Sequence, residues 1–470
     1  MKPSIPQGTR DLSPEVVRKR QYIFGTLRSI FELYGFQPLE TPAMENLTTL
    51  TGKYGEEGDR LIFKILNNGL HEKSEADKNK LNAEWNNVLS RSYSSPVVTE
   101  RALRYDLTIP FARYVVMHHH ELALPFRRYQ MQPVWRADRP QKGRYREFWQ
   151  CDADVVGSTS LINEAELLCI YGQAFSRLAI PVAIKVNSRK LLQGLSEICG
   201  HPDKMTDITV ALDKLDKIGW SGVANELQAR GIDADGVARL EQVIQVFGTN
   251  SEKLQALVQI MATSEAGMQG ITEITDTLSY YAQLADHNMA GDAQIVVDVS
   301  LARGLNYYTG IIVEVVCTHP DVKMGSIGGG GRYDDLTGLF GLKGLSGVGV
   351  SFGIDRIYDV LEELALFPQQ LSAATKAIIL NFGGENERYA LDILRRCREA
   401  GIAAEIYPDA AKFDKQMKYA NKRGIQYVLL PGDDERAAGR ISVKNFTTGE
   451  QTLLDVADAI SLLQQASATL

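Results

Sequence analysis

An arginine-rich loop between two extended runs is the stretch of this sequence best suited to chemistry. Residues 126–156 read FRRYQMQPVWRADRPQKGRYREFWQCDADVV, a pattern typical of an antiparallel hairpin with a long tip. Up to residue 146 the tip has Asp138 as its acid and the following cations: Arg136, Arg139, Lys142, Arg144 and Arg146. Arginine presents a planar fork that matches phosphate oxygens. The tip therefore predicts a partner rich in phosphate, with a solvated surface loop as the alternative.

Polar side chains also gather on one side of both runs. Because side chains alternate between the two faces of a strand, one side of each run carries the following residues: Gln130, Gln132 and Arg136 on the first, and Gln150, Asp152 and Asp154 on the second. So polar a face is unlikely to be core, and its carboxylates and amides could hold an ammonium group. A pocket that is cationic at one end and anionic at the other fits a reaction between a polyanion and a zwitterion.

Three segments resemble one known family. The string WRADRPQKGRYREFWQCDAD resembles motif 2 of class II aminoacyl-tRNA synthetases, and of the histidyl-tRNA synthetases in particular. RGLNYYTG at 303–310 is similar to their histidine-recognition signature, and GGGRYDDL followed by GVGVSFGIDRI is similar to motif 3. The resemblance spans nearly the whole chain. It implies ATP-dependent ligation of L-histidine to tRNA(His) through a histidyl-adenylate, by a cytoplasmic homodimer that uses Mg²⁺.

The resemblance assigns roles to four cationic residues. Activation brings two anions together, so the enzyme mainly positions and neutralises them. Arg136 would contact the α-phosphate of ATP, Arg303 would bridge that phosphate and the substrate carboxylate, and these two form the expected catalytic pair. Arg356 would hold the γ-phosphate. Arg144 would bind ATP and, with Lys142, reach the acceptor end of tRNA. The alternative for Arg303 is a strand-end salt bridge.

The resemblance also implies a histidine pocket. Neutral imidazole offers one donor and one acceptor. Its expected residues are Asp106, Leu107, Thr108 and Gln150 for the α-ammonium group, Asp154 and Tyr308 for the ring, and Tyr307 for the wall. From sequence alone, the tripeptide 106–108 also fits a helix cap. The two tyrosines also fit hairpin packing, in which neighbouring strand residues face opposite ways and one of them touches the ligand.

The elements that must position these residues follow from local patterns. Residues 13–34 have helical spacing, and with the proline-bearing segment after them they are similar to motif 1, which builds the dimer interface of the family. Residues 59–66 predict a strand and 67–96 an inserted polar excursion without a period. Residues 292–318 predict a hairpin that turns at Arg303–Gly310. His118, His119 and His120 are expected at a helix end, since consecutive helical residues cannot converge on one metal ion.

We expect an α/β (α+β) chain: a class II catalytic domain built on an antiparallel sheet over residues 1–187 and 291–368, interrupted by a helical insertion at 188–290. Residues 374–470 alternate strands and helices and resemble the anticodon-binding domain of class II synthetases. There the resemblance suggests tRNA contacts for Lys415 and Lys418, with a solvated helix face as the alternative.

Composition narrows the class of protein. With 470 residues, 44% of them hydrophobic and 23% charged, the chain is an ordinary globular one of two or three domains. It has no apolar run that predicts a membrane span, and the N-terminus has no secretory or transit pattern. Five scattered cysteines indicate free thiols and no cysteine-based metal site. A net charge of −7 means that RNA binding must rest on local basic patches.

Two other functions compete with the ligase. One is a regulatory paralogue of histidine biosynthesis that binds histidine without catalysis. Such paralogues lack the C-terminal tRNA domain and tend to lose catalytic arginines, whereas this chain has residues 375–470 and Arg303. The other is a class II ligase for a different amino acid, which the RGLNYY string disfavours.

Overall fold

The computed structural model describes residues 2–52, 54–90, 95–285, 293–302, 307–368, 371 and 375–468. The described residues fall into two compact units. One comprises residues 1–11 and 20–366, and the other residues 12–19 and 367–470. Arg303 lies outside the described residues.

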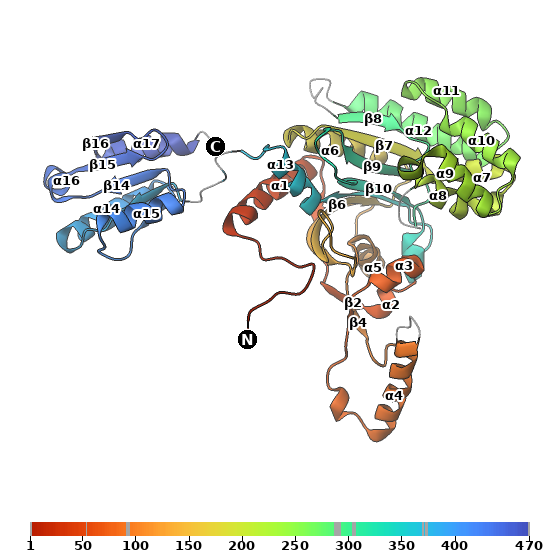
Figure 1. Ribbon diagram of the computed structural model, residues 1–470, viewed down its shortest axis with the longest axis horizontal. Helices are drawn as coiled ribbons and strands as arrows, with labels where there is room; N and C mark the ends of the chain where they lie inside the picture. The colour runs from red at the N-terminus through yellow and green to blue at the C-terminus, as the bar shows by residue number, and fades with distance from the viewer. Residues whose placement is uncertain are drawn as a thin grey trace. The chain divides into compact units, whose positions relative to one another are not determined.

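An eight-stranded sheet, built from described residues of the first unit, carries the candidate site (Figure 1). Its strands in spatial order are β1 (Gln37–Pro38), β5 (Phe126–Trp135), β6 (Glu147–Val156), β11 (Gly347–Gly353), β10 (Gly328–Tyr333), β9 (Ile311–Cys317), β7 (Val182–Ser188) and β8 (Ala293–Val297). The neighbours from β5 to β7 pair antiparallel, while the outermost strands β1 and β8 each pair parallel. The predicted hairpin of residues 126–156 is therefore confirmed as β5 and β6.

Aromatic residues cover one face of this sheet. Helices α1 (Pro14–Leu33) and α6 (Ile162–Arg177) pack there, with Tyr171 4.6 Å and Phe31 5.8 Å from Phe352, measured between ring centroids. The opposite face is polar, because Gln132 pairs with Gln150 across β5 and β6 and Gln130 pairs with Asp152. The alternation of apolar and polar residues along the strands thus assigns one face to the core and the other to the site.

The predicted hairpin of residues 292–318 is wrong. β8 and β9 are not neighbours, because β7 lies between them, parallel to β8 and antiparallel to β9. Consecutive strands are usually adjacent in a sheet. Here β7, which comes before both strands in the chain, lies between β8 and β9. Local sequence carries no signal for this exchange.

A small three-stranded sheet is formed by residues that come before the β5–β6 hairpin in the chain. It consists of β2 (Met44–Asn46), β4 (Arg101–Leu103) and β3 (Lys64–Ile65), with short helices α2 (Leu47–Leu50) and α3 (Gly55–Leu61) beside it. The strand predicted at 59–66 is therefore mostly wrong, since helix α3 occupies its first residues and only two residues pair. Short apolar runs do not distinguish helix from strand by period alone.

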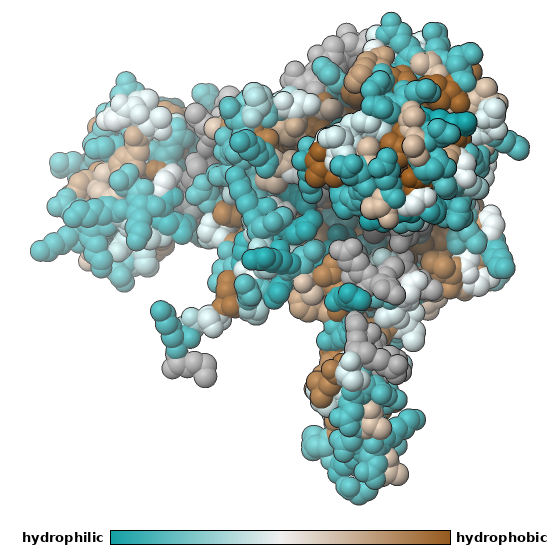
Figure 2. Space-filling model, turned by 45° about the vertical axis from the view of Figure 1, so that its right-hand side comes forward, coloured by the Kyte–Doolittle hydropathy of each residue, from teal (hydrophilic) through white to brown (hydrophobic). Residues whose placement is uncertain are grey.

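The excursion at 67–96 is confirmed as a projection between two strands, but it contains a helix. Helix α4 (Glu75–Ser90) extends away from the three-stranded sheet (Figure 1), and its surface is largely hydrophilic in Figure 2. None of the sixteen residues of α4, all of them described, is buried. The side chain of Asn67 closes the base of this arm, donating to the carbonyls of Pro96 (3.1 Å) and Val97 (3.2 Å) and accepting from the Glu100 N–H (2.7 Å).

The described residues between β7 and β8 form helices, which lie beside β7–β9 (Figure 1). The helices are α7 (Arg189–Ile198), α8 (Met205–Leu212), α9 (Leu215–Ala229), α10 (Ala234–Ile244), α11 (Asn250–Ile260) and α12 (Glu265–Leu284). Helix α12 packs against α6 and α7, so these helices share a unit with the sheet.

The second unit has its own five-stranded sheet in the described chain. Its strands in spatial order are β13 (Ala404–Ile406), β12 (Ala377–Ile379), β14 (Tyr427–Leu430), β15 (Arg440–Asn445) and β16 (Gln451–Asp455). Its helices are α14 (Gly384–Glu399), α15 (Phe413–Lys422), α16 (Asp433–Ala438) and α17 (Val456–Ala468). This confirms the alternating α/β pattern, to which the structure adds β16 and α16. None of the helices in the described ranges combines the length and apolar character needed to cross a bilayer.

Candidate active site

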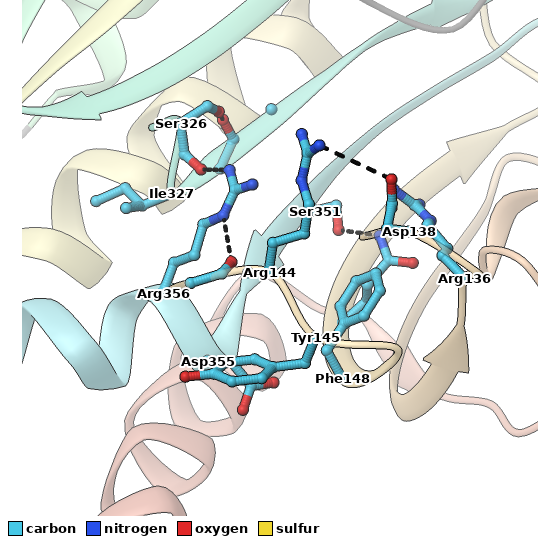
Figure 3. Close-up of a pocket in the computed structure, with 15 residues that line it drawn as sticks. Arg136, Asp138, Arg144, Tyr145, Phe148, Ser326, Ile327, Ser351, Asp355 and Arg356 are labelled. Carbon is cyan, nitrogen blue, oxygen red and sulfur yellow. Dashed lines mark hydrogen bonds and ion pairs between the residues drawn. The ribbon is translucent and has the colours of Figure 1, made fainter. Parts of the chain in front are cut away.

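Three arginines line a pocket on the polar face of the large sheet. The pocket has a volume of about 280 Å³ and lies between the hairpin tip, β10, β11 and the start of helix α13 (Ile354–Glu363). Arg136, Arg144 and Arg356 reach it from these different elements (Figure 3). The structure therefore brings together the three described arginines predicted to bind ATP.

Backbone carbonyls and aromatic rings fix two of these guanidinium groups. Arg136 Nε donates to the Tyr105 carbonyl at 3.1 Å, and its guanidinium carbon lies 4.2 Å from the centroid of the Tyr105 ring. Arg356 Nε donates to the Gly143 carbonyl at 3.0 Å, and Nη1 donates to Ser326. Arg144 is held more loosely, 3.8 Å from Asp138 with half of its side chain exposed.

The arginines repel one another. Burial lowers the pKa of Arg356, and the positive charges of Arg144 and Arg136 lower it further. Bringing like charges into one partly buried pocket costs free energy that a bound polyanion would recover. The electrostatics thus favour a ligand such as a triphosphate.

Asp106 opens a second, acidic site beside this pocket. Its Oδ1 accepts from the Tyr54 hydroxyl at 2.9 Å and from the Ile109 N–H at 3.1 Å. The backbone contact satisfies the start of helix α5 (Thr108–His118), so the helix-cap interpretation is correct for this oxygen. Leu107 is fully buried, and its carbonyl accepts from Arg128 Nη2 at 3.4 Å.

Asp154 is held at the floor of the acidic site. The Tyr333 hydroxyl donates to Oδ1 at 2.5 Å, and Arg128 Nη2 lies 2.8 Å from Oδ2. Arg128 is itself fully buried, with its guanidinium 4.3 Å from the centroid of the Phe111 ring. A buried carboxylate with a buried cation on one side keeps its orientation but still needs partners for its remaining lone pairs.

Two glycines make room for the pocket side chains. A Cβ on Gly349 would lie 1.9 Å from Asp154 Oδ1, and a Cβ on Gly331 would lie 2.9 Å from the Tyr308 ring. Glycine in a strand interior often marks a place where a ligand or another backbone approaches closely. At these two positions the glycines instead accommodate the protein's own side chains.

Several buried polar atoms of the acidic site have no hydrogen-bond partner among the described residues. We call these the open polar atoms: Asp106 Oδ2, Gln150 Oε1, Asp152 Oδ1, and Nε and Nη1 of Arg128. A buried polar atom without a hydrogen bond lowers the stability of the folded protein unless a ligand or a water molecule bonds to it. Burial raises the pKa of Asp106, Asp154 and Asp152, the last to about 7, and the neighbouring Asp154 charge contributes to the rise at Asp152.

The expectation that so polar a face lies outside the core is wrong for its inner part. Gln130, Asp152 and Asp154 are all at most 2% exposed. Residues of α5 and the tyrosines at 307 and 308 belong to a hydrophobic cluster that packs over this end of the sheet. The polar face is therefore the floor of an enclosed site.

Tyr307 and Tyr308 precede β9 rather than lying in a strand. Their ring centroids are 5.0 Å apart, and Tyr307 lies 6.2 Å from Tyr333. Both rings therefore enter one cluster, contrary to the expectation of opposite faces. Burial raises the pKa of Tyr308, and the negative charges of Asp154, Asp152 and Asp106 raise it further.

The remaining predicted residues lie in separate places. Gln150 lines the cationic pocket and donates to Ser351 Oγ at 2.9 Å, so it stands between the two sites. Lys142 is exposed and pairs with Glu363 at 3.1 Å. Lys415 and Lys418 are exposed on α15 of the second unit. His118 ends helix α5, as predicted.

Sequence reasoning missed three residues of the acidic site, Arg128, Tyr333 and Tyr54, and it placed Asp152 on the polar face without giving it a specific role. Arg128 shares the strand parity of Gln130, so the alternation that singled out the face could have included it as a site residue. Tyr54 comes from a segment without a local signal, and Tyr333 lies in the motif 3 resemblance, which gave it no role. The fold brings their hydroxyls to Asp106 and Asp154.

Comparison with known proteins identifies the family. A family model described as histidyl-tRNA synthetase matches residues 99–357, and one described as anticodon binding domain matches residues 376–466. The histidine–tRNA ligase of Christiangramia forsetii is 53% identical over 97% of this chain and 97% of its own length. The corresponding ligase of Phocaeicola vulgatus is 51% identical over 98% of this chain and 99% of its own length. The chain belongs to the histidyl-tRNA synthetase family.

Solved structures agree with this assignment. The crystal structure of histidyl-tRNA synthetase from Nostoc sp. PCC 7120 superposes with a TM-score of 0.81 at 28% identity, covering 99% of this chain and all of that one. A structure titled as an ATP phosphoribosyltransferase regulatory subunit/histidyl-tRNA synthetase from Bacillus halodurans has a TM-score of 0.69 at 19% identity, which shows a shared fold alone. The synthetase interpretation is therefore favoured over the regulatory one.

Proposed function

We propose that this synthetase joins L-histidine to ATP as histidyl-adenylate, releasing diphosphate, and then transfers the histidyl group to tRNA(His), releasing AMP. One observation carries the proposal. A pocket with three arginines adjoins a buried acidic site on the same sheet face, in a chain about half identical to curated histidine–tRNA ligases over its whole length.

The arginine pocket would bind the triphosphate. Following the family resemblance, Arg136 contacts the α-phosphate and Arg356 the γ-phosphate, while Arg144 adds charge from the tip. The fixed guanidinium groups of Arg136 and Arg356 support this, because preorganised donors lose little freedom when charge develops. Arg303, the second member of the predicted catalytic pair, would bridge carboxylate and α-phosphate.

The acidic site would bind the amino acid. The open oxygens of Asp106 and Gln150 can accept from an α-ammonium group, with the adjacent Thr108 beside them. Asp154 can accept from an imidazole N–H, with Tyr308 at the other ring nitrogen and Tyr307 as wall. Histidine would supply hydrogen-bond partners for these buried polar atoms, whereas other amino acids would leave them unpaired. Such a site discriminates against the other amino acids by roughly 10⁴-fold or more.

Magnesium would accompany ATP. No group of three or more histidine, cysteine, aspartate or glutamate side chains is arranged for a metal within the described ranges. Phosphate oxygens and water are ordinary ligands of this ion, so we assign it to the nucleotide.

For tRNA, we propose contacts from Lys142 and Arg144 with the acceptor end and from Lys415 and Lys418 with the anticodon arm. The match of residues 376–466 to an anticodon-binding model supports the second pair. We further propose a cytoplasmic homodimer formed through α1 and the strand segment after it. In this division, 1–187 and 291–368 are catalytic, 188–290 is an insertion, and 374–470 binds the anticodon.

The decisive experiment is ATP–diphosphate exchange with each amino acid in turn. Histidine alone should stimulate exchange. Stimulation by another amino acid would overturn the substrate assignment, and histidine binding without any exchange would favour the regulatory alternative.

A second measurement tests the catalytic role of Arg303. Arg303→Ala should depress exchange at least about 100-fold while weakening histidine binding far less, because a group that acts on developing charge contributes mainly in the transition state. Equal losses in exchange and in binding would contradict this role.

A further inference from the structure

The N-terminal segment lies against the tip of the β5–β6 hairpin. The Arg146 N–H donates to the Gly8 carbonyl at 2.9 Å. Gly8 has a positive φ of 85°, and a Cβ there would lie 2.8 Å from Arg146 Cγ. Only glycine combines this backbone conformation with so close an approach. We call residues 7–10 the strap.

Arg10, at the end of the strap, contacts two walls of the arginine pocket. Its Nη2 forms an ion pair with Asp355 in the first turn of α13, and its guanidinium carbon lies 3.3 Å from the centroid of the Tyr145 ring. Tyr145 and Asp355 both line the pocket (Figure 3). A planar guanidinium can stack on a ring and pair with a carboxylate at once, which an ammonium group cannot.

These two contacts adjoin the phosphate-binding arginines in sequence. Tyr145 follows Arg144 on the tip, and Asp355 precedes Arg356 on α13. The Arg144 side chain is half exposed, and its ion pair with Asp138 spans 3.8 Å, so its position depends on the backbone of the tip. Fixing Tyr145 therefore restricts Arg144.

Asp355 keeps other partners if Arg10 is removed. Arg20 Nη1 donates to Asp355 Oδ1 at 2.6 Å, and the Trp149 N–H donates to Oδ2 at 3.1 Å. The start of α13 therefore stays neutralised and hydrogen-bonded without the strap. The tip of the hairpin, in contrast, loses the stacking partner of Tyr145.

We propose that Arg10 is a positioning residue for the nucleotide: by stacking on Tyr145 and pairing with Asp355 it helps to set the separation of Arg144 and Arg356. It acts beside two other contacts between the tip and α13, Arg356 with the Gly143 carbonyl and Lys142 with Glu363. The inference rests on the proposed role of this pocket in binding ATP. The segment GTRD at 8–11 would thus contribute to nucleotide binding, a role that its amino-acid composition and residue spacing do not indicate.

The test is steady-state ATP–diphosphate exchange with Arg10→Gln and Arg10→Lys. Misplacing one phosphate-binding group should raise the KM for ATP about tenfold or more in Arg10→Gln, with the KM for histidine changed less than about twofold. Arg10→Lys should fall between this variant and the unchanged protein, because it keeps the ion pair and loses the stacking.

Arg127→Gln is the matched control. Arg127 is similarly exposed, pairs with Glu166 at 2.6 Å and lies 5.7 Å from the Phe36 ring centroid, away from the pocket. It should leave both KM values unchanged. If Arg10→Gln behaves like Arg127→Gln, or raises both KM values equally, the proposal is wrong.

A double-mutant cycle separates positioning from general destabilisation. Arg10→Gln and Tyr145→Leu remove the two sides of one stack, so their effects on the KM for ATP should not add. Additive effects would overturn the proposed coupling. If the unchanged protein shows no exchange with any amino acid, the proposed function fails. Calorimetric titration with ATP then still tests the strap, because Arg10→Gln should weaken ATP binding and unaltered binding would contradict it.

Discussion

Buried carboxyl groups at the sheet floor make the stability of this synthetase depend on pH. Asp152 is 2% exposed, and its pKa is raised to about 7 by burial and by Asp154. An acid whose pKa is higher in the folded state contributes stability that is complete below its unfolded pKa and is lost as the pH rises through its folded pKa. For Asp152 that window runs from about pH 4 to about pH 7.

Asp152→Asn should therefore stabilise the ligand-free protein at pH 8 and have little effect at pH 4. The gain at pH 8 is on the order of 1–4 kcal/mol, because each pKa unit corresponds to about 1.4 kcal/mol. Urea unfolding of the variant and the unchanged protein across this range measures it, with the exposed Asp276→Asn as control. A gain that does not vary with pH would contradict the assignment.

Gly349 shows how much of the proposed histidine pocket depends on the absence of a side chain at this position. In Gly349→Ala the new Cβ would displace the Asp154 carboxyl, which Tyr333 and Arg128 prevent from swinging away freely. We expect the KM for histidine to rise about 10- to 100-fold, since the imidazole partner is misplaced, while the KM for ATP changes little.

Exchange kinetics with varied histidine and varied ATP measure this difference. Gly172→Ala is a suitable control, because the nearest atom to its added Cβ is the Tyr281 hydroxyl at an ordinary 3.8 Å. A Gly349 variant with an unchanged KM for histidine would remove Asp154 from the proposed pocket.

At the scale of elements, the arm that carries α4 projects from the three-stranded sheet (Figure 1). Helix α4 buries none of its sixteen residues, all of which are described, and the Asn67 side chain closes the arm at its base. The arm thus contributes little to the core of the first unit, whereas its base connects β3 with the segment that leads to β4.

Replacing residues 70–90 by a short glycine–serine linker should leave exchange activity unchanged and alter the free energy of unfolding by less than about 1 kcal/mol, because loop length has a weak entropic effect. Asn67→Ala should instead cost about 1–3 kcal/mol, since it strips partners from buried backbone groups. Thermal and urea unfolding of both variants distinguish arm from base. Loss of exchange in the linker variant would show that the arm serves catalysis.

The elements also show where sequence reasoning succeeds. The hairpin of β5 and β6 and the strand that enters α13 were predictable because strand alternation and flanking glycines are local signals. The placement of β7 between β8 and β9 was not, because strand order is decided by long-range packing. The same division applies to the site: Gln150 and Asp154 follow from alternation, whereas Tyr54 and Arg10 reach their partners only through the fold.

At the scale of the whole molecule, amino-acid activation and anticodon binding are proposed for separate units. Lys415 and Lys418 are exposed on α15. Reversing both charges, Lys415→Glu with Lys418→Glu, should weaken tRNA aminoacylation and reduce the salt dependence of tRNA binding by about two phosphate contacts. ATP–diphosphate exchange should stay unchanged, because it does not require tRNA.

The control is the same charge reversal on α14, Arg388→Glu with Arg395→Glu. Both arginines are mostly exposed. If the two double variants lower aminoacylation equally, the effect comes from net charge, and the proposed anticodon contact by α15 is wrong.

The order of strands in the large sheet imposes a delay between the synthesis of β6 and the synthesis of its neighbour β11. β6 ends at Val156, yet its neighbour β11 begins only at Gly347. At roughly 5–20 residues per second, a ribosome takes about 10–40 s to deliver that partner. Throughout this interval the nascent hairpin presents an unfilled backbone edge next to charged side chains destined for burial. Slow codons or a chaperone acting within this stretch of the message would therefore affect the yield of active enzyme more than the same delay after residue 366.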